Sequence, residues 1–94
     1  MVEFHTTDSA LIVFEVLSRS NKKKDREWRK QVYGSIPNCQ HYVTISAKKL
    51  EVVRHDRTNK WAEVKLTDRT AILDLPAVDV ALTLRDIYRW TPIE

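Results

Sequence analysis

The sequence predicts a mixed α/β domain, because a continuous apolar stretch is followed by a short helical segment and then by alternating polar and apolar residues. Residues 11–17 are apolar at odd and even positions alike except for Glu15, which is typical of a central strand covered on both faces. From His41 onward, polar and apolar residues alternate as they do in half-exposed antiparallel strands. We therefore expect a central strand, a short basic helix, a meander of about five strands and a terminal helical turn.

The basic helix is expected to begin near Asp25, which is a favourable N-cap residue, or one turn earlier at Ser20 or Asn21. Gly34 is the only glycine of the chain, and it fits the left-handed position that ends many helices. The apolar stripe of this helix is formed by Trp28, Val32 and Tyr33. We expect this stripe to belong to the core.

Alternation with a period of two predicts the strands of the meander at residues 42–45, 50–55, 61–66, 72–75 and 78–82. The side chains expected to point inward from the third of these are Ala62, Val64 and Leu66. Thr83 and Asp86 form a Thr-x-x-Asp pattern that opens a short terminal helix. Trp61 and Trp90 are expected to serve as packing residues.

Composition places the 94 residues in one small domain with a net charge of +3. The longest apolar run is too short to span a membrane, and the sequence begins without an export signal pattern. Cys39 is the single cysteine and cannot form an internal disulfide, so we expect a cytoplasmic protein. Cys39 and His41 are too few for a zinc site, and one glycine cannot make a phosphate-binding glycine loop.

Charge is concentrated in residues 19–30, where seven basic residues against two acidic residues give a net charge of +5. Two interpretations remain open for this segment: a solvated helix face, or a surface that contacts the phosphate backbone of DNA. The residues expected to make such contacts are Arg19, Lys22, Lys23, Lys24, Arg26 and Lys30.

Glu15 is the most informative residue of the predicted central strand. A buried carboxylate costs several kcal/mol unless it is paired, protonated or bound to a metal. One interpretation is a structural group that is solvated or paired to a nearby basic residue. The other is a functional carboxylate.

Several short motifs, spread over nearly the whole chain, resemble one family of bacterial nucleases. They are residues 14–20 (FEVLSRS), Asp25, Tyr33, residues 36–37 (IP) and residues 40–43 (QHYV). Together they resemble the C-terminal half of the Uma family of bacterial restriction endonucleases, which belongs to the PD-(D/E)XK nuclease superfamily. The resemblance implies a restriction-endonuclease-like mixed sheet with a truncated core, with residues 1–10 as a lead-in and residues 11–94 as the half-domain.

The resemblance also implies hydrolysis of DNA with Mg²⁺ or Mn²⁺, in which Glu15 is a metal ligand. Arg29 stands where the family has a catalytic Lys, and the two residues are not equivalent. The family's second metal ligand, an Asp on the preceding strand, has no clear counterpart, and Glu3 could replace it only if the first residues doubled back. We therefore expect an endonuclease only if another chain supplies that Asp. The alternatives are a degenerate nuclease fold that binds nucleic acid or a partner without cutting, and a purely structural small domain.

The missing upstream strand has a structural consequence for residues 11–17. Without that neighbour, this apolar strand would expose an unpaired edge, and such edges associate with other chains. We therefore expect a homo-oligomer or a complementing chain that covers the Leu11–Leu17 edge.

Overall fold

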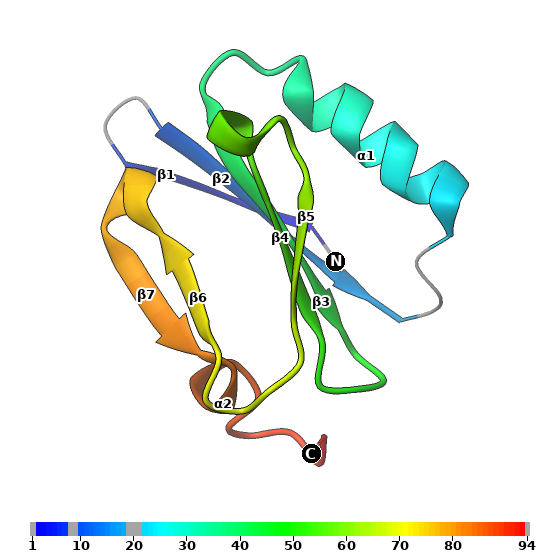
Figure 1. The fold of residues 1–94 in the computed structure, drawn as a ribbon, viewed down its shortest axis with the longest axis vertical. Coiled ribbons are helices and arrows are strands. Elements are labelled where there is room, and N and C mark those ends of the chain that lie inside the picture. The colour runs from blue at the N-terminus through cyan, green and yellow to red at the C-terminus, as the bar shows by residue number, and fades with distance from the viewer. Residues whose placement is uncertain (1, 8–9, 19–21, 94) are drawn as a thin grey trace.

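The computed structural model describes residues 2–7, 10–18 and 22–93, and it contains a five-stranded mixed sheet in the order β1-β2-β3-β4-β5 (Figure 1). The strands are β1 (Val2–Thr7), β2 (Ala10–Leu17), β3 (Cys39–Ser46), β4 (Val52–Asp56) and β5 (Glu63–Leu66). β2 and β3 are parallel, and the other neighbours are antiparallel. The predicted α/β class and the central position of residues 11–17 are confirmed, whereas the nuclease-like fold stays a prediction.

β1 covers the edge of β2 that we expected to be unpaired. Its register places Val2 opposite Glu15 and Glu3 opposite Phe14, so the first residues do double back along β2. The prediction of an exposed Leu11–Leu17 edge is therefore wrong, and the reason for expecting a partner chain at that edge is removed. Residues 2–7 include Val, Phe and Thr, which favour strands, but apolar and polar residues alternate only from Val2 to His5.

Helix α1 (Lys23–Gly34) connects β2 to the parallel strand β3 and lies on one face of the sheet (Figure 1). It begins two residues before Asp25, which lies in the first turn, where a carboxylate interacts favourably with the helix dipole. No glycine has a positive φ among the described residues, so the left-handed conformation predicted for Gly34 is wrong. A glycine fits here because a Cβ atom would lie 3.1 Å from Nε1 of Trp61.

The buried face of α1 differs from the predicted stripe by one residue. Tyr33 is buried as expected, but Trp28 is 56% exposed and Arg29 is buried in its place. The cause is an ion pair between Arg29 and Glu15 of β2, which turns this side of the helix toward the sheet. The core on this face consists of Leu11, Val13, Tyr33, Cys39 and Tyr42.

The opposite face of the sheet is covered by a two-stranded sheet of β6 (Ile72–Leu75) and β7 (Val80–Thr83) and by the short helix α2 (Leu84–Ile87) (Figure 1). The predicted meander therefore divides between two sheets. The buried residues of this layer are Ile12, Val43, Val52, Leu73, Leu75, Leu84 and Tyr88. The predicted opening of α2 is confirmed, because Oγ1 of Thr83 accepts a hydrogen bond of 3.2 Å from the Asp86 backbone N–H.

Two short 3₁₀ helices, Arg57–Asn59 and Pro76–Val78, connect strands. After the first of these, Lys60 and Trp61 both have a positive φ, which delays the start of β5 to Glu63. Ala62 is therefore exposed, contrary to the prediction, and Trp61 is half-buried. Trp90 is 91% exposed, so its predicted packing role is wrong. No helix in the described part of the chain is both long and apolar enough to cross a membrane.

Candidate functional site

Glu15 and Arg29, the two predicted catalytic residues, form a buried ion pair between β2 and α1. Nε of Arg29 lies 2.7 Å from Oε1 and 3.2 Å from Oε2 of Glu15. Glu15 is 9% exposed and Arg29 is 8% exposed. The cost of burying each charge is offset by the opposite charge beside it. The structure therefore supports the interpretation in which Glu15 is paired to a nearby basic residue.

The donor set around Glu15 does not fit a Mg²⁺ site. Mg²⁺ requires oxygen ligands in octahedral geometry, and here both carboxylate oxygens face a guanidinium group. The register position opposite Glu15 is Val2, and Glu3 is opposite Phe14. Within residues 10–18 and 22–93, no three His, Cys, Asp or Glu residues lie together in a way that could hold a metal ion.

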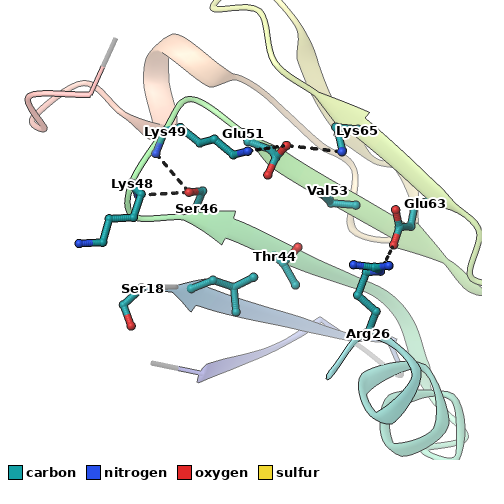
Figure 2. Close-up of a pocket in the computed structure, with 11 residues that line it drawn as sticks. Ser18, Arg26, Thr44, Ser46, Lys48, Lys49, Glu51, Val53, Glu63 and Lys65 are labelled. Carbon is teal, nitrogen blue, oxygen red and sulfur yellow. Dashed lines mark hydrogen bonds and ion pairs between the residues drawn. The ribbon is translucent and has the colours of Figure 1, made fainter. Parts of the chain in front are cut away.

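A pocket opens beside this ion pair, at the carboxyl ends of the parallel strands β2 and β3. Ligands commonly bind at this end of parallel strands. The pocket has a volume of about 580 Å³, and one of its lining residues, Thr44, is the register neighbour of Glu15. Figure 2 shows its polar residues, which are the hydroxyls of Ser18, Thr44 and Ser46, the cations Arg26, Lys48, Lys49 and Lys65, and the carboxylates Glu51 and Glu63.

Salt bridges cross the pocket walls (Figure 2). Oε1 of Glu51 lies 3.8 Å from Nζ of Lys49 and 3.6 Å from Nζ of Lys65. On the side of α1, Nε of Arg26 lies 3.1 Å from Oε1 of Glu63. The four cations exceed the two carboxylates, so the pocket favours an anion.

The described residues that were predicted to bind DNA lie on α1 or directly before it, and they separate into two groups. Arg26 lines the pocket, whereas Lys22, Lys23, Lys24 and Lys30 are exposed. A second hollow between α1 and β5 is lined by Lys23, Arg26 and Lys30 and shares Arg26 and Glu63 with the pocket. The cationic surface of α1 therefore continues into the pocket. Arg19 lies outside the described residues.

The pocket residues other than Arg26 were missed by the sequence analysis. Lys65 alternates with apolar residues along β5, and Lys48 and Lys49 occupy a polar turn after β3. Each of these patterns is typical of an ordinary solvated surface. Only the sheet order, in which β4 lies between β3 and β5, places these residues around one cavity.

His41 belongs to a polar contact on the other face of the sheet. Its Nδ1 lies 2.6 Å from Oδ1 of Asp56, and its Nε2 lies 3.4 Å from the backbone N of Ala77, which donates to it. Nε of Arg54 lies 2.9 Å from Oδ2 of Asp56. These contacts connect β3 and β4 to the 3₁₀ helix before β7, so His41 has a structural role.

His55 packs on the α1 side of the sheet, stacked on Tyr42 with ring centroids 4.0 Å apart. Burial lowers the pKa of His55, because it disfavours the charged imidazolium. Burial also raises the pKa of Tyr42, so both rings are neutral near pH 7. The two rings therefore pack against each other and add no charge to the neighbouring basic residues of α1.

Comparison of this chain with protein-family models, curated proteins and solved structures finds no match. The relationship to the Uma family therefore stays a prediction from the sequence motifs.

Proposed function

We propose that this protein binds the phosphate backbone of nucleic acid without cutting it. One contrast carries the proposal. Glu15, the expected metal ligand, is engaged by Arg29, whereas the lysines of α1 are exposed to solvent. The carboxylate needed for hydrolysis is thus paired with Arg29, while the ammonium groups needed for backbone binding are accessible to a ligand.

The cationic surface of α1 suits a backbone contact. Its 12 residues correspond to a length of about 18 Å, enough to follow several phosphates of a duplex. Lys23 and Lys30 line the second hollow, which lies between α1 and β5. Contacts from lysines to phosphates position a protein on nucleic acid without reading the base sequence.

The competing function is metal-dependent hydrolysis, which the position of Glu15 beside the pocket favours. It requires Arg29 to release the carboxylate and another chain to supply a second acidic ligand. Binding without cleavage requires neither change, and we prefer it for that reason.

Replacing Lys23, Lys24 and Lys30 together with Gln should weaken binding to a fluorescently labelled DNA duplex. Each lost phosphate contact should reduce the slope of log K against log salt by about 0.9, because fewer counterions are released. Fluorescence anisotropy between low and physiological salt measures both quantities.

The matched control is the Gln triple variant of Arg69, Arg85 and Arg89, which line one hollow on and around α2. It removes the same charge from a different surface and should largely keep the wild-type slope. Equal losses in both variants would show that net charge, rather than α1, governs binding. Binding that is absent or insensitive to salt would contradict the proposal altogether.

A further inference from the structure

We infer that the pocket at the carboxyl ends of β2 and β3 is a binding site for a phosphate monoester, the group carried by a nucleoside monophosphate or by the 5′ end of a nucleic acid strand. The inference goes beyond backbone binding by α1, because its main groups lie on β3, in the turn after β3, on β5 and directly after β2. Lys49, Lys65 and the hydroxyls of the pocket are its main components.

Hydroxyl groups on β3 and directly after β2 provide hydrogen-bond donors for phosphate oxygens. Oγ of Ser46 accepts hydrogen bonds from the backbone N–H groups of Lys48, at 3.1 Å, and Lys49, at 3.2 Å. Its hydroxyl proton therefore remains available to a ligand. Thr44, two residues earlier on β3, and Ser18, directly after β2, add their hydroxyls to the same cavity (Figure 2).

Glu51 forms long ion pairs with the ammonium groups of Lys49 and Lys65 at the edge of the pocket. The separations of 3.8 Å to Lys49 and 3.6 Å to Lys65 exceed the roughly 2.8 Å of a charge-assisted hydrogen bond. Both lysines are exposed, so these ion pairs are weak. A phosphate dianion with two negative charges can replace Glu51 as the partner of both ammonium groups.

The size and lining of the cavity fit a ligand larger than inorganic phosphate. Its volume of about 580 Å³ lies within the usual range for small-molecule sites. Leu17 and Val53 supply apolar surface beside the charged groups. In a nucleoside monophosphate, the phosphate can contact the lysines while the nucleoside contacts this apolar surface.

Titration with adenosine 5′-monophosphate, followed by ¹H–¹⁵N NMR of the full chain, tests the inference. The backbone amides of Thr44, Ser46 and Lys65 should shift with saturation, and adenosine without phosphate should leave them unchanged. Equal shifts with adenosine would overturn the inference, and so would the absence of shifts with both adenosine 5′-monophosphate and a short strand that carries a 5′-phosphate.

Three substitutions test whether the charges of the pocket determine its affinity for the monophosphate. Lys65→Gln should weaken binding of the monophosphate about tenfold, because a charged contact is lost. Glu51→Gln should strengthen binding several-fold, because it removes a competing negative charge. Lys60→Gln, outside the pocket, should change nothing. Weaker binding in Glu51→Gln, or equal losses in Lys60→Gln and Lys65→Gln, would contradict an anion site.

Two further probes identify the source of the phosphate. A short single strand with a 5′-phosphate is compared with the same strand carrying a 5′-hydroxyl. Binding of the phosphorylated strand but not of the free mononucleotide indicates a strand end, and binding of both indicates that the phosphate and its nucleoside suffice. The helix triple variant Lys23, Lys24 and Lys30→Gln should keep its affinity for the mononucleotide, so failure of backbone binding can be separated from failure of the pocket.

Discussion

Replacing Arg29 with Met should lower the free energy of unfolding by about 3–5 kcal/mol, because it leaves the Glu15 carboxylate buried without its partner. Methionine retains most of the length of the side chain, so the effect comes mainly from the lost charge. Urea unfolding at pH 7, followed by tryptophan fluorescence, measures the change.

The matched control is the double variant Glu15→Leu with Arg29→Met, which removes both charges and keeps an apolar contact between β2 and α1. It should recover most of the lost stability, because no buried charge remains unpaired. A loss below about 1 kcal/mol in Arg29→Met would show that solvent reaches Glu15 and that the pair does not connect helix and sheet.

Replacing Asp56 with Ala should lower the free energy of unfolding by about 3 kcal/mol. The substitution leaves Nδ1 of His41 without its acceptor and removes the carboxylate beside Arg54. His41 and Asp56 are both buried, so water cannot easily replace the lost contacts. Thermal and urea unfolding of the purified variant provide the measurement.

Asp56→Asn is the appropriate comparison, because its side-chain oxygen can still accept the hydrogen bond from His41. It should retain at least half of the stability that Asp56→Ala loses. Similar losses in the two variants would instead assign the effect to the charge near Arg54.

Local pattern was sufficient for most elements of the fold. The apolar stretch around Glu15 is the central strand β2, and Thr83 with Asp86 opens α2. The full length of β1 could not be predicted from the sequence, because the alternation of apolar and polar residues stops after His5. The buried face of α1 also differs from the prediction, because the contact that orients the helix joins Arg29 to a residue 14 positions earlier.

The candidate site was only partly predictable, because it also depends on contacts between residues that are distant in the sequence. The sequence indicated that Glu15 needs a partner and that Arg29 lies near it, and the structure brings these two together. The pocket beside them depends on side chains from five separate segments, including Ser18, Lys49 and Lys65. Their proximity follows from the order of strands in the sheet, and no spacing in the sequence encodes it.

The most direct test of binding without cleavage uses supercoiled plasmid in the presence of Mg²⁺ or Mn²⁺, with wild-type protein and Glu15→Gln compared side by side. We predict that both proteins retard the plasmid at low salt and that neither produces nicked or linear DNA. Cleavage by the wild-type protein that disappears in Glu15→Gln would contradict the account, because Glu15 would then act in hydrolysis.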